Sequence, residues 1–397
     1  MDPHAPLIDG ALATEARAAL DAVVAKLRAL PPEADVEPTL FDAAGPALLF
    51  AALGRTNDAA ERLDRCVARA SDVELSTDLH RGVAGLAWVI ERVGQGGDAN
   101  DAVDEALLDA LAQEPWPGDF DLMHGLAGTA VYALERAHLP SGAALLARLV
   151  AQLGALSSEA PGGRLWLTTR AMVPSFRAGG RFPQVDCGAL HGQPGVLAAL
   201  AGAAAWDVPG ARALLDDGVG AFLRLVGEGD DGGRVPGCYP LANGPSRSAR
   251  NVWCYGDLGA AATLLAAART AREPAWERIA LDLARHAARH GDPPGTIRDA
   301  QLCHGAAGVG HCFHRLYRAT GEAVFRDRAV AWFAHCLTLR GEDGAFPSWR
   351  TQPPPDRWAF DAGYLEGNAG VGLALADALG LASLPWDRPL ALSLRTP

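Results

Sequence analysis

The sequence predicts an all-α protein built as a two-layered α/α ring of seven helical hairpins. Three observations predict this fold class. Alanine and leucine dominate an apolar share of 49%, and aromatic residues make up only 7%, a composition that favours helices over strands. A G-x-x-G motif that leads into an apolar run recurs along the chain, and amphipathic stretches alternate with it. Such a period indicates a repeat architecture, so we expect residues 1–397 to form a single domain.

The first kind of repeat segment begins with paired glycines and continues with residues that are almost free of charge. A helix that is apolar all round is a buried helix, so these segments are predicted to form the inner layer. The glycines let neighbouring backbones approach closely. A seventh, degenerate copy has Asp42 in place of the first glycine and keeps Gly45. The six intact pairs are Gly82/Gly85, Gly125/Gly128, Gly192/Gly195, Gly256/Gly259, Gly305/Gly308 and Gly367/Gly370.

The second kind of segment is longer and mixes charged with apolar residues, which is typical of a helix with one face in water. These helices are predicted to form the outer layer. Seven of them are expected, over residues 13–30, 57–71, 99–113, 141–157, 209–228, 274–291 and 323–340.

The shared glycine motif also predicts where an active site would lie. Inner helices that all begin with this motif direct their N-termini to one end of the ring. Backbone N–H groups and partial positive charge gather there, and this environment favours thiolates and anions.

Composition and charge exclude several classes of function. Thirty-five basic against 47 acidic residues give a net charge of −12, so no basic surface for nucleic acid or an anionic membrane is expected. The N-terminus lacks the pattern of a secretory signal, and no uncharged apolar run of about 18 residues predicts stable membrane insertion. Seven scattered cysteines in such a chain indicate a reducing compartment, which favours a cytoplasmic protein.

Two inner-helix starts carry cysteine at the same place in the repeat, namely Trp253-Cys254-Tyr255-Gly256 and Leu302-Cys303-His304-Gly305. In a ring these starts are neighbours. Two thiolates and one imidazole give three ligands and leave a fourth position for water or substrate, which is the pattern of catalytic zinc. The alternative is that both cysteines are small buried apolar residues. The residues most easily mistaken for further ligands are Cys187, Cys238 and His311, whereas Cys66, Cys312 and Cys336 are expected to be core thiols.

With W-C-Y-G, C-H-G and seven repeats in place, the chain resembles the lanthionine synthetase C-like cyclases. The resemblance extends from about Phe41 to Leu381. It implies an α/α toroid of two seven-helix layers and one Zn²⁺ ion held by Cys254, Cys303 and His304.

The same resemblance implies roles for further residues. His191, in Ala-Leu-His-Gly, matches the acid/base histidine, and Asp121 matches an aspartate near it. Arg250 and Tyr255 match the family's arginine and tyrosine around the first cysteine. No kinase or lyase region is attached, so the resemblance implies a stand-alone cyclase for a precursor peptide dehydrated elsewhere. A dehydratase or transporter complex is a further expected partner.

The implied reaction adds a peptide cysteine thiol across dehydroalanine or dehydrobutyrine, giving a thioether ring. The thiolate is the nucleophile, and the α-carbon then needs a proton, from His191 or from His124. Arg250 or a protonated His191 would stabilise the enolate oxygen. Asp121 either orients His191 or caps the following inner helix.

Several alternatives stay open at the level of sequence. Prenyltransferases and terpene cyclases use other ligand sets or aspartate-rich clusters, and neither D-x-D-D nor D-D-x-x-D occurs here. Toroidal glycosidases need paired carboxylates, and Glu366 has no evident partner. A non-catalytic zinc-bearing scaffold that binds peptides or glutathione is the remaining rival. The insertion at 161–186, with four arginines, is either a lid or peptide-contact loop or an inert surface loop.

Overall fold

A computed structural model describes residues 5–34, 37–94, 97–172, 182–227, 233–240, 251–350 and 357–397. The chain forms two compact units. The first unit comprises Met1–Ser76, Arg81–Ala99 and Asp292–Trp386, and the second comprises Thr77–His80, Asn100–Gly291 and Asp387–Pro397. That both units belong to one domain stays a prediction.

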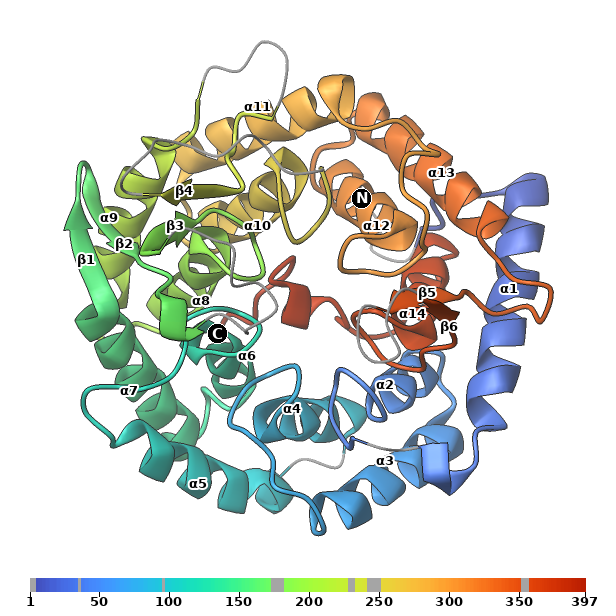
Figure 1. Cartoon of the computed structure of the whole chain (residues 1–397), viewed down its shortest axis with the longest axis horizontal. Coiled ribbons are helices and arrows are strands. Elements are labelled where there is room, and N and C mark those ends of the chain that lie inside the picture. Colours follow the sequence, from blue (N-terminus) through green and yellow to red (C-terminus); the bar gives the residue numbers. More distant parts are fainter. Residues whose placement is uncertain are drawn as a thin grey trace. The chain divides into compact units, whose positions relative to one another are not determined.

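In the first unit, α14 packs between α2 and α12, and α1 packs against α14 and α13 (Figure 1). Strand β5 (Ser348–Arg350) pairs antiparallel with β6 (Arg357–Ala359), with Trp349 opposite Trp358. The glycine-led helices described in this unit are α2 (Gly45–Ala52), α4 (Val83–Val93), α12 (Ala306–Thr320) and α14 (Asn368–Ala378). The amphipathic ones are α1 (Gly10–Arg28), α3 (Thr56–Ala70) and α13 (Ala323–Thr338).

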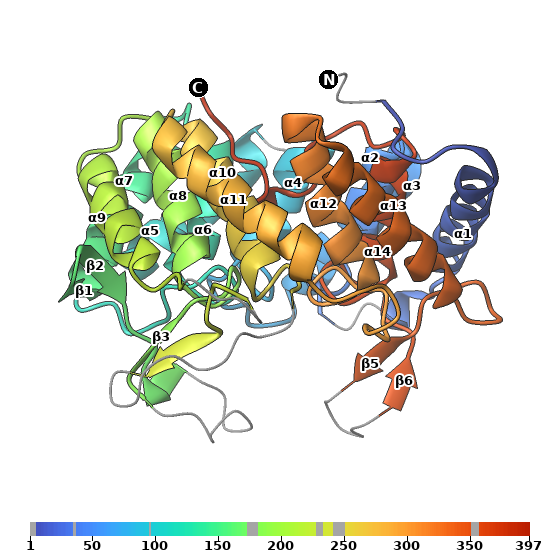
Figure 2. The same cartoon turned by 90° about the horizontal axis from the view of Figure 1, so that it is seen from above.

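In the second unit, α8 packs against both α6 and α10 (Figure 1). The described glycine-led helices are α6 (Leu126–Glu135), α8 (Gln193–Ala205) and α10 (Asp257–Thr270), and the amphipathic ones are α5 (Asp101–Leu111), α7 (Pro140–Leu156), α9 (Ala211–Leu223) and α11 (Pro274–His290). Strand β1 (Ser157–Ala160) pairs with β2 (Gly163–Trp166), and β3 (Gln184–Asp186) pairs with β4 (Cys238–Pro240). The β3–β4 pair lies at the end of this unit's helices that is away from the chain's C-terminus (Figure 2). Among the described residues, short 3-10 turns cover Pro32–Ala34, Gly97–Asn100, Arg170–Met172 and Arg388–Leu390.

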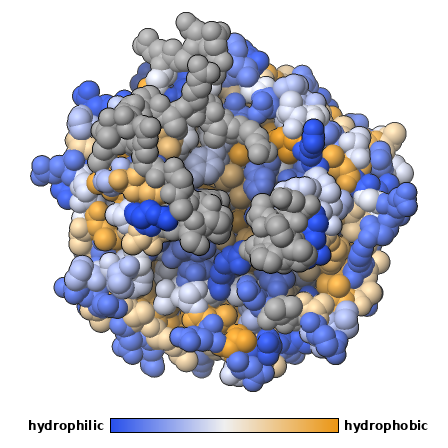
Figure 3. Space-filling view, in the orientation of Figure 1, coloured by the Kyte–Doolittle hydropathy of each residue, from blue (hydrophilic) through white to orange (hydrophobic). Residues whose placement is uncertain are grey.

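The two predicted kinds of helix are both present in the described part of the chain. Helix α8 is buried without interruption from Gln193 to Ala203, as expected of an inner helix. Helix α1 keeps basic residues in its last turn, and hydrophilic side chains line the edge of the first unit that α1 forms (Figure 3). Among the described residues, no helix combines the length and the apolar character that crossing a bilayer requires.

The glycine motif fixes how each inner helix meets the loop before it. At α12 the N–H groups of Ala306, Ala307 and Gly308 donate to the carbonyl oxygens of Asp299, Ala300 and Gln301, at 2.9, 3.1 and 3.3 Å. The starts of α6 and α14 show the same backbone pattern. These N–H groups, which a helix otherwise leaves unpaired, are therefore used by the loop. Of the two sources of positive charge predicted for these helix N-termini, free N–H groups and the helix dipole, only the dipole therefore remains at these helices.

The second glycine of the motif is required by close packing, as Gly195 of α8 shows. A Cβ atom there would overlap the carbonyl oxygen of Ala189 and lie 3.2 Å from the Cβ of Leu122. We expect Gly195→Ala to lower the free energy of unfolding by about 1–3 kcal/mol, measured by urea denaturation. The control is Gly154→Ala in α7, whose added Cβ meets nothing closer than 3.8 Å and should be neutral or stabilising by about 0.5–1 kcal/mol. Equal effects of the two substitutions would contradict this account.

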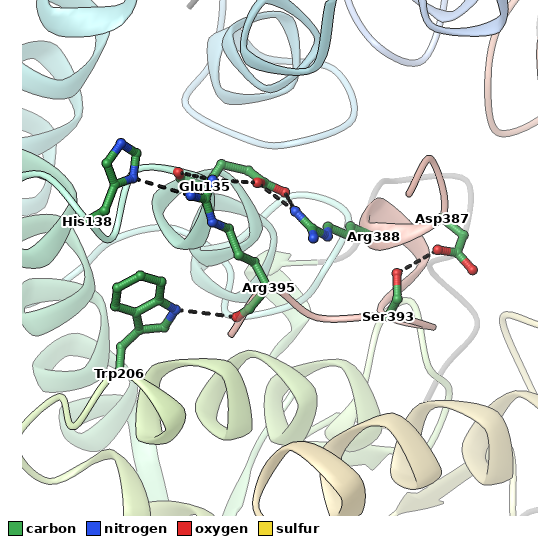
Figure 4. A network of polar contacts seen from close by, with 7 residues as sticks. All are labelled: Glu135, His138, Trp206, Asp387, Arg388, Ser393 and Arg395. Atoms are coloured by element: carbon green, nitrogen blue, oxygen red, sulfur yellow. Dashed lines mark hydrogen bonds and ion pairs between the residues drawn. The ribbon is translucent and has the colours of Figure 1, made fainter. Parts of the chain in front are cut away.

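The C-terminal segment of the second unit is held by a buried carboxylate (Figure 4). Glu135, at the end of α6, is fully buried, and its two carboxylate oxygens accept from Arg388 Nη1 at 2.5 and 2.7 Å. Arg395 Nη1 donates to the backbone oxygen of Glu135 at 2.6 Å, and Trp206 Nε1 donates to the backbone oxygen of Arg395 at 3.4 Å. In the same segment, the backbone oxygen of Leu390 accepts a hydrogen bond from Trp253 Nε1 at 2.9 Å. It therefore supports the residue directly before Cys254.

Candidate active site

Asp121 and His191 form a close pair in the second unit. Asp121 lies in the loop before α6 and His191 in the loop before α8, and Leu122 N–H joins the two loops by donating to the Leu190 carbonyl at 3.0 Å. His191 Nδ1 is 2.6 Å from Asp121 Oδ2. The carboxylate is buried, whereas 18% of the His191 side chain is exposed. One imidazole face is therefore reachable while its Nδ1 is held.

The electrostatics of the pair keep Asp121 ionised. Burial favours its neutral form, but the hydrogen bond and charge of His191, together with His124, outweigh burial and lower the pKa of Asp121. Asp121 Oδ1 accepts from the His124 N–H at 2.6 Å. Helix α6 itself begins after Gly125 without a side-chain cap. Asp121 therefore contacts both the His191 ring and the His124 N–H before α6, and its role in orienting His191 stays a prediction.

Tyr255 and Cys254 pack against the segment that leads to His191. The Tyr255 hydroxyl donates to Asp186 Oδ2 at 2.7 Å, and Asp186 Oδ1 accepts from the Gly188 N–H at 2.8 Å. A Cβ on Gly188 would lie 2.5 Å from the Cys254 carbonyl oxygen. Position 188 therefore requires glycine, and the Cys254 backbone packs against the loop that leads to His191.

Asp186 was missed by sequence reasoning. Burial raises the pKa of Asp186, against the hydrogen bonds from Gly188 and Tyr255. A signal was present, because an aspartate stands six residues before the first glycine in four repeats. These aspartates are Asp119, Asp186, Asp299 and Asp361.

Asp119 is a half-buried carboxyl close to the pair. Burial and the charge of Asp121 raise the pKa of Asp119 to about 7, against two backbone hydrogen bonds and the charge of His191. An acid with a raised pKa binds more protons in the folded state, so it makes stability fall as pH rises from about 4 to about 7.

We expect Asp119→Asn to remove this fall, because the amide oxygen can still accept from the Phe120 N–H (2.7 Å) and carries no charge. The measurement is the free energy of unfolding of both proteins across that pH window. The wild type should lose up to a few kcal/mol relative to the variant towards pH 7. Parallel curves would contradict the raised pKa.

His124, the alternative proton donor, lies near His191. Its ring stacks at 6.0 Å between centroids from that of His191. Its Nδ1 is 4.0 Å from Asp78 Oδ2, and 36% of its side chain is exposed. His124 therefore has a longer and looser carboxylate contact than His191 has.

In the first unit, Cys303 and His304 stand directly before α12. The Cys303 N–H donates to the Leu365 carbonyl at 3.1 Å, which fixes this turn against the loop before α14. Cys303 is buried, and His304 keeps 36% of its side chain exposed. His304 Nε2 faces Asp299 Oδ2 at 4.0 Å. A carboxylate behind one ring nitrogen is the usual way to orient an imidazole whose other nitrogen binds a metal.

The predicted metal ligands lie in both units, and most of the other cysteines are buried. Cys254 belongs to the second unit, and Cys303 and His304 belong to the first; one metal site formed by all three stays a prediction. Cys187 is fully buried, and burial raises the pKa of its thiol well above the usual value, as fits a core thiol. Cys66, Cys312 and Cys336 are also buried. Arg250 lies outside the described residues, as does the middle of the 161–186 insertion.

Comparison with solved structures defines the class of fold. The chain is similar to nisin cyclase, with a TM-score of 0.70 and 17% sequence identity over 94% of this chain and 96% of that one. This likeness confirms the predicted α/α toroid. A family model described as lanthionine synthetase C-like protein matches residues 36–390. The chain belongs to the lanthionine synthetase C-like family.

Proposed function

We propose that this protein is a zinc-dependent lanthipeptide cyclase. Its substrate would be a dehydrated precursor peptide that carries dehydroalanine or dehydrobutyrine and free cysteines. The sulfur bonds to the β-carbon of the alkene, and a proton is added at the α-carbon, so thiol and alkene become one thioether without a by-product. The observation that carries the proposal is the Asp121–His191 pair, at 2.6 Å, beside the segment of Cys254.

The donor set suits zinc. Two buried cysteines, Cys254 and Cys303, and the imidazole of His304 are soft and borderline ligands of the kind that Zn²⁺ prefers. Two thiolates would also balance the charge of the ion. When bound, zinc would supply a peptide thiol in its deprotonated form at neutral pH. Asp299 would hold the ring of His304 in place.

The protein's own residues would handle the proton. His191 has one nitrogen on Asp121, so its other nitrogen would deliver a proton to the α-carbon. The ionised Asp121 fixes the ring orientation and stabilises an imidazolium. Tyr255, tied to Asp186, would position the Cys254 segment rather than donate the proton. Arg250 remains a candidate for stabilising the enolate oxygen.

The proposed partners follow from the substrate. A peptide dehydrated elsewhere requires a separate dehydratase, and the enzyme would work in the cytoplasm, alone or in a complex with the dehydratase or a transporter. The acidic net charge of −12 does not favour binding of nucleic acid.

The test is incubation of the purified protein with a dehydrated model peptide that contains cysteine. Cyclisation leaves the peptide mass unchanged, so free thiols are counted by alkylation and mass spectrometry. We expect the number of alkylated thiols to fall with time. Binding of the peptide or of glutathione without any loss of thiols would instead favour a non-catalytic scaffold.

A further inference from the structure

Two histidines and an aspartate meet inside the first unit, away from the residues assigned to the active site. His311 and His314 are three residues apart on α12, so they share one face of that helix, and Asp377 lies near the end of α14. The ligand atoms of these three residues all lie within 4.8 Å of one another. Both histidine side chains are only 1% exposed. His311 lies five residues into α12, roughly 8 Å along the axis from its first residue.

The distances in this cluster match the edges of a tetrahedral metal site. Asp377 Oδ2 lies 3.2 Å from His314 Nδ1 and 3.5 Å from His311 Nδ1. Bonds of about 2.0–2.2 Å to Zn²⁺ place neighbouring ligand atoms about 3.3–3.6 Å apart in a tetrahedron, against about 2.8–3.1 Å in an octahedron. The 3.5 Å distance falls in the tetrahedral range, and the 3.2 Å distance lies about 0.1 Å from either range.

Hydrogen bonding alone does not account for this arrangement. His314 Nδ1 and Asp377 Oδ2 are both buried and lie 3.2 Å apart, but the angles between them are poor for a hydrogen bond. Buried polar atoms are almost always satisfied, so two that face each other unsatisfied need a third group. A cation between them would satisfy both.

The surroundings hold the three donors in a state suited to a metal. Burial lowers the pKa of His314, which favours the neutral imidazole, and the histidines and Arg318 outweigh burial and lower the pKa of Asp377 to about 2. Arg318 Nη1 donates to the other carboxylate oxygen, Asp377 Oδ1, at 2.9 Å, which turns Oδ2 towards the histidines. The ring of Trp386 lies 4.4 Å from that of His311 between centroids and covers it.

We propose that His311, His314 and Asp377 bind a second divalent ion of the Zn²⁺ type. Two imidazoles with one carboxylate suit zinc and its neighbours better than Mg²⁺ or Ca²⁺. Because the cluster is closed to substrate, the ion is structural. It ties α12 to α14 and so steadies the helix that follows Cys303 and His304.

The test uses the full chain with its two candidate thiolate ligands removed. Cys254→Ala/Cys303→Ala retains the cluster but offers no sulfur ligand at the active site. After dialysis against a weak chelator, we expect about one zinc per chain, with only nitrogen and oxygen neighbours in its X-ray absorption spectrum. Adding His314→Gln should remove this zinc. Chelation by a strong ligand should lower the melting temperature of the double variant and leave that of the triple variant unchanged.

Each outcome decides the matter. A folded double variant without zinc would overturn the proposal and leave an ion-pair network around Asp377. Zinc retained equally by the triple variant would overturn it too, by placing the ion elsewhere. If the triple variant does not fold, the zinc content and ligand atoms of the double variant still give the answer. None of these results depends on cyclisation, so they remain valid if the proposed function fails.

Discussion

Replacement of His191 by asparagine is expected to lower the rate of cyclisation about 10²–10⁴-fold while the zinc content stays unchanged. The reason is that His191 is partly exposed and hydrogen-bonded to the ionised Asp121, the arrangement of a general acid and its orienting carboxylate. The measurement is the loss of alkylatable thiols under single-turnover conditions, with zinc determined on the same samples. Asp121→Asn should cause a smaller loss and should alter the pH profile of the rate, because it removes the charge that stabilises a protonated His191.

Two further histidine variants make this prediction specific. His124→Asn tests the alternative donor, whose nearest carboxylate contact is 4.0 Å; we expect less than a tenfold effect. His290→Asn replaces an exposed histidine of the same unit and should leave the rate unchanged. A greater loss in His124→Asn than in His191→Asn would transfer the acid role to His124.

Replacement of Cys254 by alanine is expected to abolish both zinc binding at the active site and cyclisation. A catalytic zinc site has three protein ligands, so loss of one thiolate leaves too few to hold the ion. The measurements are zinc determined by elemental analysis after chelator dialysis, and thiol loss on the dehydrated peptide. One zinc equivalent fewer than in the wild type is the expected result, whether or not the structural ion is present.

Cys187→Ala is the matched control for this experiment. Cys187 is a buried thiol of the same unit, and its Sγ lies 3.9 Å from the Val185 carbonyl oxygen. We expect its zinc content and rate to equal those of the wild type. Loss of zinc in Cys187→Ala would show that the wrong thiol had been assigned.

The helices could be predicted from the sequence because their signals are long and repeated. The amphipathic stretch expected at 274–291 is α11, Pro274–His290, and the one expected at 323–340 is α13, Ala323–Thr338. The expected stretch at 209–228 extends beyond α9, which ends at Leu223. Strands β1 to β3, in or near the insertion at 161–186, and strand β4 could not be predicted, since three or four residues are too few to show a period of two.

The site was predictable only where a motif marked it. His191 and Asp121 were found through the family's pattern, and their contact confirms that they lie together. Asp186 and Asp119 were missed, although both stand six residues before the first glycine of a repeat, because the contacts of a loop carboxylate depend on the fold. His311 was considered only in relation to the cysteines, since its partner Asp377 lies 66 residues further along the chain and is brought near by the packing of α12 on α14.

The central claim is most directly tested by comparing cyclisation by metal-free protein with cyclisation by the same protein after zinc is restored. Both samples receive the dehydrated cysteine-containing peptide, and alkylated thiols are counted by mass spectrometry over time. The account predicts that thiols persist with the metal-free protein and disappear once zinc is restored, and that Cys254→Ala does not respond to zinc. Equal thiol loss with and without zinc, in protein shown by elemental analysis to be free of metal, would contradict it.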